Sequence, residues 1–491
     1  MTYTRLAGRD ISAQAGGDLT LLPGQHQSQE QSWPEDWDSQ FLGIVTERYM
    51  VRKDTRKTQT LESVVTASGN LALEAGGNLK VKAADLHAEG EASLSSGGDL
   101  VLEAGSNQVS TDTHTYHRKH LWSSESDAHD TQEQNVPTRL EARNIKMNSK
   151  GDTHVRGSVV RSQENTDIRA RKLVVDGQVL KGDEAYKENA GDMLGGLVTK
   201  RRADNSGSSE THVGSDINAG GKLTVAADDV LIKGSKVIGE QGAELISDKG
   251  AVTLESSHNL VRRQKDESNG ALFGAIGSSE QSQQHTEQAK RSEASSGTNL
   301  AISAKTDANI TGAKVTAKAE VSVNAEGDVN ITPDIDSDKV QSHQRDRHFV
   351  ATAKQTQDAE DNKAASRQWI AEVGLQQVDT QANTEASKVS RPTIEGANVA
   401  INAGGTATLD SADVTAHEGE VNIEGKRVVL GSTSDSHSEQ KTTRTIGGGI
   451  GVTAGMDRSG SYSSGRTKRQ KPANTAPPPR PPTSPAKPTR T

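Results

Sequence analysis

The sequence predicts an all-β solenoid, in which short strands and tight corners repeat to form stacked coils. Three observations indicate this class: polar corner residues recur at an eight-residue offset, apolar stretches recur at an interval of 21 or 22 residues, and apolar and polar residues alternate between corners. The offset pairs are Asp10 and Asp18, Asn70 and Asn78, Asn144 and Asp152, Asn299 and Asp307, and Asn398 and Thr406.

The longer interval gives the size of one coil. Leu79 and Leu100 are 21 residues apart, as are Leu300 and Val321, and Val399 lies 22 residues before Val421. Three sides of about seven or eight residues would close such a coil, and β-rich solenoids stack one coil per repeat.

The corners contain Gly-Gly-Asn at 76–78 and Gly-Gly-Asp at 97–99. These residue types tolerate the positive φ angles of a tight turn, so we expect them to bend the chain in that conformation. Between corners the alternation has the period of a strand, which predicts a thin inner column of Leu, Val, Ile and Ala.

The composition is unsuited to thick globular cores. Only 31% of the 491 residues are hydrophobic and 2% are aromatic, whereas a solenoid needs just one narrow inward face per coil. There is no cysteine, which excludes disulfides and thiolate metal sites.

The charge is unevenly distributed along the chain. The net charge is −9, but residues 466–491 contain seven Lys or Arg and no acid, which leaves −16 on the rest. We therefore expect no broad basic surface for nucleic acid. The basic segment is also rich in proline, which predicts a disordered tail of extended polyproline II character.

The repeats divide the chain into coil-forming blocks and polar excursions. The predicted domains are a repeat β-helix at 1–465 and the disordered tail at 466–491. Blocks of about two coils each, ten to twelve coils in all, are expected near 1–24, 62–106, 138–180, 213–260, 297–334 and 392–431. Excursions are expected near 25–61, 107–137, 181–212, 261–296, 335–391 and 432–465.

Most excursions are expected to be hairpins extruded from the rod. Several have a Gly-rich apolar centre between polar arms, at 193–198, 271–277 and 446–455, as two strands meeting at a turn would have. The segment 351–390, rich in Ala, Gln, Lys and Glu, is equally compatible with a helix.

Phrases such as Ala-Gly-Gly-Asn-Leu at 75–79, Ser-Gly-Gly-Asp-Leu-Val-Leu at 96–102 and Gly-Ala-Asn-Val at 396–399 resemble the haemagglutinin repeats of filamentous haemagglutinin-like exoproteins. Contact-dependent growth inhibition (CdiA-like) proteins have similar repeats. The resemblance covers nearly the whole chain before the tail, and it implies a right-handed parallel β-helix within a very large protein secreted through a partner outer-membrane pore, by two-partner secretion. Members of this family are adhesins and virulence factors, or deliver a C-terminal toxin.

The resemblance also implies a cellular location and partners. The protein would be secreted or associated with the outer membrane at the cell surface, with an outer-membrane transporter for the full-length protein. Glycans or receptors on host or neighbouring cells would be its ligands. Neither the family's N-terminal secretion domain nor its C-terminal effector domain is recognisable, and Met1 is not followed by a signal peptide, so we expect a fragment.

Several residue groups have a composition that could form a chemical site. His114, His117 and His120 could ligate a metal, although Arg118 and Lys119 between them would repel it. The glycines Gly447, Gly449 and Gly451 resemble a dinucleotide loop only superficially, because no helix is expected after them.

The corner residues and the acidic residues are further candidates. Asn70, Asn78 and Asp99 are interpreted as corner residues and not as calcium ligands, because the Gly-x-Asp continuation of calcium-binding β-rolls is missing. A carbohydrate-active enzyme would need clustered carboxylates beside a basic residue, whereas Asp228, Asp229 and Asp413 follow strands singly or at corners.

The four tryptophans, Trp33, Trp37, Trp122 and Trp369, all fall in predicted excursions, where each could stack on a sugar, anchor a partner or pack back on the rod. The prediction is thus a non-enzymatic display rod without catalytic, cofactor-binding or metal-binding residues and without a cofactor. Two alternatives stay open: a toxin-delivery stalk that engages a target outer membrane, with membrane contact through the excursions, and a carbohydrate-active β-helix enzyme.

Overall fold

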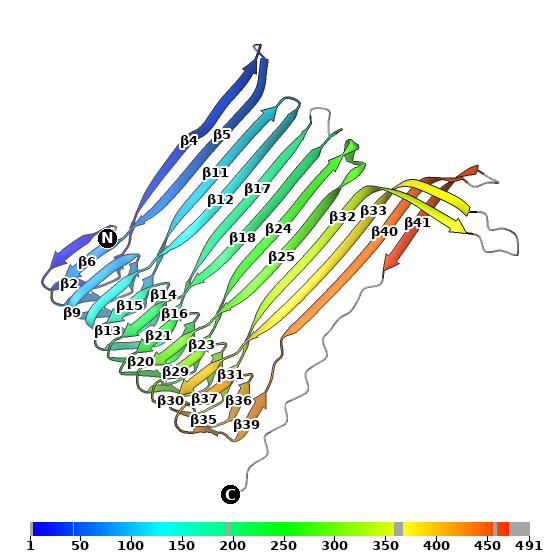
Figure 1. Ribbon diagram of the computed structural model, residues 1–491. Coiled ribbons are helices and arrows are strands. Elements are labelled where there is room, and N and C mark those ends of the chain that lie inside the picture. The colour runs from blue at the N-terminus through cyan, green and yellow to red at the C-terminus, as the bar shows by residue number, and fades with distance from the viewer. Residues whose placement is uncertain (1–2, 43, 193–196, 358–366, 455–458, 471–491) are drawn as a thin grey trace, which may run out of the picture.

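A computed structural model describes residues 3–42, 44–192, 197–357, 367–454 and 459–470. The described residues are almost entirely β-strand, with one short 3₁₀ turn, η1 (Leu272–Gly274). Figure 1 shows two parts: a stack of small coils, and a set of long hairpins that project side by side from one flank of that stack. We call the first part the coil stack and the second the projecting sheet.

The coil stack is a parallel β-helix whose strands form three ladders, so the predicted all-β solenoid is confirmed. The first ladder contains β1 (Arg5–Gly8), β6 (Ser63–Ala67), β9 (Ala84–Ser96), β13 (Arg139–Ser149), β15 (Val159–Ser162), β19 (Asp216–Ala219), β21 (Lys236–Gly239), β26 (Glu293–Ser296), β29 (Lys314–Ala317), β34 (Thr393–Gly396) and β37 (Asp413–Ala416). The second contains β2 (Ile11–Ala15), β7 (Leu71–Ala75), the second halves of β9 and β13, β16 (Thr166–Asp176), β20 (Lys222–Lys233), β22 (Gly242–Ser247), β27 (Leu300–Ala304), β30 (Glu320–Ala325), β35 (Asn398–Ala403) and β38 (Val421–Glu424). The third contains β3 (Leu19–Leu21), β8 (Leu79–Lys82), β10 (Leu100–Glu103), β14 (Asp152–Arg156), the second halves of β16 and β20, β23 (Val252–Glu255), β28 (Ala308–Thr311), β31 (Val329–Thr332), β36 (Thr406–Asp410) and β39 (Arg427–Gly431).

Each ladder passes through eleven levels in the described residues, so the stack has eleven coils, from coil 1 (β1–β3) to coil 11 (β37–β39). The registers join Leu79 to Leu100, Leu300 to Val321 and Val399 to Val421, which are the pairs that defined the coil interval in the sequence. At ~4.8 Å per level the stack is roughly 50 Å long. The number of coils lies within the predicted range, although the first block holds one coil instead of two.

The core is a column of inward-facing aliphatic side chains. In β7 the burial alternates, with Leu71 and Leu73 inside and Ala72 partly exposed. The same alternation recurs through coils 2 to 10 and gives one continuous cluster, mostly of Leu, Val, Ile and Ala, against which partly buried side chains of the two end coils pack. Each Å² of buried apolar surface stabilises the fold by about 25 cal/mol, so this stabilisation is concentrated along the axis of the stack.

The predicted corner residues link successive coils. The Asn78 backbone N–H donates to Asp18 Oδ1 in coil 1 (2.7 Å), and the Asp99 N–H in coil 3 donates to Asn78 Oδ1 (2.8 Å). The same bond from a backbone N–H to a corner oxygen of the preceding coil recurs at Asn70 to Asp10, Glu91 to Asn70, Asp152 to Asp99, Asn165 to Asn144, Glu320 to Asn299, Asp328 to Asp307 and Glu420 to Asn398. The structural interpretation of these residues is confirmed.

The corner glycines have another role than the one expected. Gly76 and Gly97 are not among the described residues with positive φ, so the left-handed conformation is not what these positions require. A Cβ on Gly97 would instead lie 2.1 Å from the Gly76 carbonyl oxygen, and one on Gly76 would lie 2.2 Å from that of Gly16. Glycine is needed here because successive coils approach too closely for a side chain.

Left-handed residues occur at a different corner, after the third strand of every even-numbered coil. The residues are Ala83, Gly157, Gly234, Gly312 and Ser411, with φ between 42° and 58°. Here the chain crosses directly into the next coil. After the odd-numbered coils it leaves the stack and forms a hairpin.

Buried hydroxyl side chains line the entry to many coils. Ser215 donates to the carbonyl oxygens of Val155 (2.9 Å) and Asp176 (2.6 Å), and Ser292 donates to those of Ile232 (3.1 Å) and Glu255 (2.5 Å). These bonds satisfy carbonyl groups that the corners would otherwise leave buried and unpaired.

The excursions are hairpins, as expected. The hairpins are β4 (Gly24–Phe41) with β5 (Ile44–Leu61), β11 (Gly105–Lys119) with β12 (Trp122–Val136), β17 (Gln178–Asp192) with β18 (Lys200–Val213), β24 (Ser257–Ala271) with β25 (Ile276–Lys290), β32 (Asp334–Gln357) with β33 (Arg367–Ser390), and β40 (Ser436–Ala454) with β41 (Ser459–Gln470). The helix considered for 351–390 is wrong, because the described part of that segment belongs to β32 and β33. We number these hairpins 1 to 6.

The six hairpins pair with one another into a single antiparallel sheet of twelve strands. One hairpin supplies two strands for every two coils, and strands in both parts are spaced by ~4.8 Å, so the projecting sheet and the stack advance in step. Strand β41 reaches Gln470, five residues into the segment assigned to the tail, and the polyproline part at 471–491 lies outside the described residues.

Candidate contact surface on the projecting sheet

The projecting sheet is a single layer of strands. In β11 and β12 nearly every side chain is intermediate or exposed, at both odd and even positions. Because neither face is covered by a second layer, both faces can meet other molecules. Its side chains have no role in the apolar core, so the sheet is the place to look for a contact surface.

An aromatic cluster lies across hairpins 1 and 2. The ring centroids of Trp37 and Tyr49 are 5.9 Å apart, those of Tyr49 and His117 5.5 Å, and those of His117 and Trp122 5.8 Å. The rings come from β4, β5, β11 and β12, and the last two contacts are edge-to-face. Such pairs contribute roughly 0.5–1.5 kcal/mol each beyond burial.

Two charged side chains, Glu47 and Lys119, border the same rings. The Glu47 carboxylate lies 3.0 Å from His117 Nε2 and 3.5 Å from Lys119 Nζ. The hydrogen bond from His117 is the main reason that the pKa of Glu47 is lowered; desolvation opposes this shift, and Lys119 adds to the lowering. Glu47 is thus an ionised acceptor beside a row of aromatic rings.

The opposite face of the same hairpins is polar. Arg52 lies over the ring of Trp33 at 5.4 Å. His114 Nδ1 pairs with Asp127 at 2.8 Å, and His129 Nδ1 pairs with Asp112 at 2.6 Å. Each of these groups is paired with a neighbour on its own face.

The histidines considered as metal ligands are not brought together. His114 and His117 lie three positions apart on β11, so they face opposite sides of the sheet, and His120 lies in the turn. Within the described residues no group of three potential His, Asp or Glu ligands is found.

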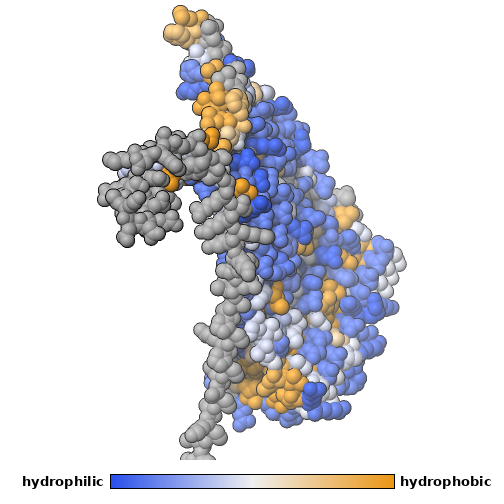
Figure 2. Space-filling model, turned by 90° about the vertical axis from the view of Figure 1, so that its right-hand side faces the viewer, coloured by the Kyte–Doolittle hydropathy of each residue, from blue (hydrophilic) through white to orange (hydrophobic). Residues whose placement is uncertain are grey.

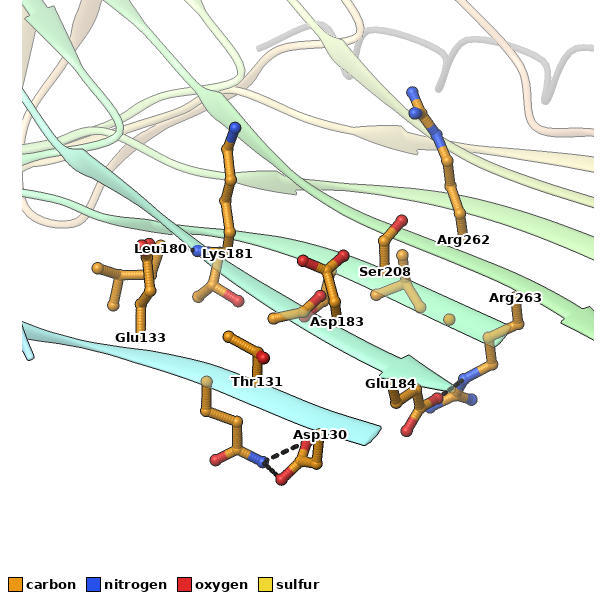
Figure 3. Close-up of a pocket in the computed structure, with 16 residues that line it drawn as sticks. Asp130, Thr131, Glu133, Leu180, Lys181, Asp183, Glu184, Ser208, Arg262 and Arg263 are labelled. Carbon is orange, nitrogen blue, oxygen red and sulfur yellow. Dashed lines mark hydrogen bonds and ion pairs between the residues drawn. The ribbon is translucent and has the colours of Figure 1, made fainter. Parts of the chain in front are cut away.

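A polar hollow of about 350 Å³ lies where hairpins 2, 3 and 4 meet (Figure 3). Asp130 and Glu184 are register partners there, and Glu184 Oε1 lies 3.7 Å from Arg263 Nε. The hollow thus holds two facing carboxylates, one of which pairs with a basic residue, as the enzyme alternative requires. The side chains of Glu184 and Arg263 are 64% and 63% exposed, however, and an open surface lacks the low-dielectric enclosure that tunes catalytic carboxylates.

The other residues considered in the sequence as possible sites lie in strands or at corners. Gly447 and Gly449 lie in β40, where a Cβ on Gly449 would come within 3.0 Å of the Val373 carbonyl, so they belong to a strand and not to a cofactor loop. Asp229 is a corner acceptor for the Ala251 N–H (3.0 Å), and Asp228 pairs with Lys249. Trp369, 56% exposed, lies in β33.

The hairpin turns contain apolar side chains that the sequence analysis did not single out as a group. Leu42 is 87% exposed, Leu121 64%, Val198 67% and Phe273 71%. Figure 2 shows hydrophobic residues at the end of the projecting sheet farthest from the coils, and again over the last coil. Leu42, Leu272 and Phe273 have φ near 50°, a conformation that hairpin turns usually assign to Asn or Gly.

No helix in the described residues is long and apolar enough to cross a membrane. No solved structure matches the chain. Two curated proteins do: a hemolysin from Proteus mirabilis, 24% identical over 463 residues, and a hemolysin from Serratia marcescens, 24% identical over 487 residues. The matches cover 93% and 96% of this chain, which spans 28% and 29% of the length of those relatives.

A family profile described as Hemagglutinin repeat matches residues 47–178, 198–277, 273–446 and 373–476. These matches cover most of the chain and include both coils and hairpins. The resemblance seen in the corner motifs is therefore confirmed, and this chain belongs to the hemagglutinin repeat family.

Proposed function

We propose that the chain is a rigid display segment of a larger adhesin-like exoprotein that is secreted or held at a bacterial cell surface. The coil stack supplies stiffness, and the projecting sheet supplies contact area on one flank. The observation that carries this proposal is the single apolar column of eleven coils, to which all six hairpins are attached in step. Such a design needs no active site.

The larger protein would use the segment as a spacer with a surface. The relatives are more than three times as long as this chain, which supports a role as one part of a longer rod. An outer-membrane transporter for that full-length protein, and a surface receptor or glycan on another cell, are the partners that this role requires.

The test removes one hairpin and leaves the stack intact. Gly24 and Leu61 are register partners at the base of hairpin 1, so joining them through a short glycine linker deletes the hairpin without stretching coil 1 or coil 2. Beads bearing the intact chain should agglutinate erythrocytes or bacteria, and beads bearing the deletion should do so less. X-ray scattering should give the same rod length for both; an intact chain that binds no cell, or whose shape is compact, contradicts the proposal.

A second candidate function is contact with a membrane through the hairpin turns. It is favoured by the exposed apolar residues Leu42, Leu121 and Phe273 in the hairpin turns. Leu42 and Phe273 also have a left-handed backbone that glycine or Asn would adopt more easily. Backbone strain of this kind costs about 1–3 kcal/mol per residue and is typical of functional positions. The name hemolysin of the two relatives supports the same candidate.

Vesicle flotation and protease protection test this candidate. The chain should float with phosphatidylcholine–phosphatidylethanolamine vesicles, and the Leu42→Ser and Phe273→Ser variants together should reduce the floating fraction severalfold. Leu430→Ser is the matched control, because Leu430 is 73% exposed but lies on the last coil, away from the turns. Equal flotation of all variants, or complete digestion of the turns in the presence of lipid, would reject membrane contact.

A further inference from the structure

The aromatic cluster at the N-terminal end of the projecting sheet has features of a ligand surface. Trp37 is 45% exposed although it contacts Tyr49, and the rings of His117 and Trp122 continue the row across the next two strands. The row therefore runs across four adjacent strands and stays open to solvent. A cluster that served packing alone would gain more by being covered.

The polar groups beside the rings are suited to hydroxyl ligands. The Glu47 carboxylate has several acceptor positions, of which His117 and Lys119 use only part, and Lys119 keeps further donor capacity. The charge of Glu47 is balanced by Lys119, so the site has no strong preference for a charged ligand.

The two faces of hairpin 1 differ in a way that identifies the ligand face. Tyr49 and Arg52 are three positions apart on β5 and so face opposite sides. Trp33 lies on the Arg52 side, with that guanidinium 5.4 Å from its ring centroid, and within the described residues it contacts no other aromatic ring. Trp37, on the Tyr49 side, has no cation over its ring in the described structure.

We propose that the surface formed by Trp37, Tyr49, Glu47, His117 and Trp122 binds an uncharged saccharide chain. Exposed rings would stack on the apolar faces of pyranose rings, while Glu47 and Lys119 would exchange hydrogen bonds with the hydroxyls. A flat, open surface favours this ligand over a peptide, which needs a pocket to bury an anchor side chain. The inference rests on the proposed function as a display segment, and it gives that function a ligand class.

Binding at one such surface should be weak. The site is shallow, and a single layer of strands cannot exclude water from the hydrogen bonds, so affinity must come from several copies engaging at once. The display of many chains on one cell surface would supply that multivalency.

The experiment uses the full chain and defined probes. An array of uncharged oligosaccharides ending in glucose, galactose or N-acetylglucosamine, with sialylated and sulfated oligosaccharides beside them, is probed with the bead-coupled chain. Hits are then titrated with the monomeric chain by tryptophan fluorescence. We expect binding to at least one uncharged oligosaccharide, a loss of at least tenfold in Trp37→Ala and Trp122→Ala, and partial recovery in Trp37→Phe.

The control is Trp33→Ala, which removes another exposed indole (56%, against 45% for Trp37) from the same strand but from the opposite face. It should bind as the unaltered chain does, and all variants should keep the same circular dichroism spectrum and Tm. Equal loss in Trp33→Ala and Trp37→Ala, binding to charged oligosaccharides alone, or no binding to any uncharged probe at 10 mM would each overturn the inference. If the chain still agglutinates cells in those cases, the display function survives and only the saccharide site is rejected.

Discussion

The coil stack and the projecting sheet are built from strands of the same chain at the same spacing, yet they are held together differently. In the stack, Leu102 is fully buried between coils, whereas Leu375 in β33 of the projecting sheet is 44% exposed. The stack has both ladder hydrogen bonds and an apolar column. The sheet has the ladder hydrogen bonds, polar pairs and little apolar burial, so its order depends on being anchored to the stack every two coils.

The sharpest way to test this difference is to remove the same side chain from both parts. Leu102→Ala should lower the free energy of unfolding by about 2–5 kcal/mol, because it leaves a cavity in the column. Leu375→Ala should have an effect within about 0.5 kcal/mol. Urea denaturation followed by circular dichroism measures both, and similar losses in the two variants would show that the sheet has an apolar core of its own.

The next largest effect is expected at the corner glycines. Gly97→Ala places a Cβ against the Gly76 carbonyl and should cost about 1–3 kcal/mol, because backbone of two coils must move apart. Gly16→Ala is the matched control, since nothing lies within 4 Å of the added Cβ in the first coil. If both substitutions are neutral in thermal unfolding, close approach is not the reason for these glycines.

A smaller effect is expected with pH at the junction between the two parts. His212 is 5% exposed at the base of hairpin 3; burial lowers its pKa, Asp176 at 3.6 Å opposes this, and Lys290 adds to it. Because the folded pKa lies below the unfolded value of about 6.5, the unfolded chain takes up the proton first as pH falls. The contribution of His212 to the free energy of unfolding should therefore be fully present above about pH 6.5 and decline as the pH falls below that value.

The His212→Leu variant should show a flatter decline between pH 7.5 and 5.5 in urea titrations. His26→Gln, an exposed histidine of the projecting sheet, should keep the slope of the unaltered chain. A slope that is identical in all three proteins would mean that His212 does not control the acid sensitivity.

The smallest effect is expected at the corners where the even-numbered coils cross directly into the next coil. Ala83 has a φ of 42°, while the equivalent Gly157 has 58°. Ala83→Gly should relieve strain and raise the free energy of unfolding by up to about 1 kcal/mol. Gly157→Ala should lower it, since its Cβ would lie 2.8 Å from that of Gln178, and opposite signs in the two variants are the result to look for.

The stack could be predicted well because its signals are local. The interval from Leu79 to Leu100 is the register itself, and the corner amides recur where each coil bends. Gly76 and Gly97 were expected to adopt positive φ, which is wrong. Their actual role, the close approach of successive coils, could not be predicted because the contacts are with residues 21 or 60 positions away. The hydroxyls of Ser215 and Ser292 gave no periodic apolar signal and were missed.

The projecting sheet was predicted only as separate hairpins. Polar side chains at both odd and even positions leave no inward face, so nothing in the sequence sets which hairpin pairs with which. Trp37 and Trp122 were predicted to lie in excursions. They belong to one aromatic cluster only because β5 pairs with β11, which joins Tyr49 to His117, 68 positions apart in the sequence. The hollow at Asp130 and Glu184 could not be predicted either, because it depends on the pairing of β12 with β17.

The alternation of crossing and extruding corners has a consequence for how such rods can change length. Loss of one coil by recombination would put the next hairpin a single strand out of place, and two hairpins would then compete for one position in the sheet. Loss or gain of two coils with their hairpin would leave every neighbour matched. Rods of this construction should accordingly differ from one another in steps of roughly 10 Å.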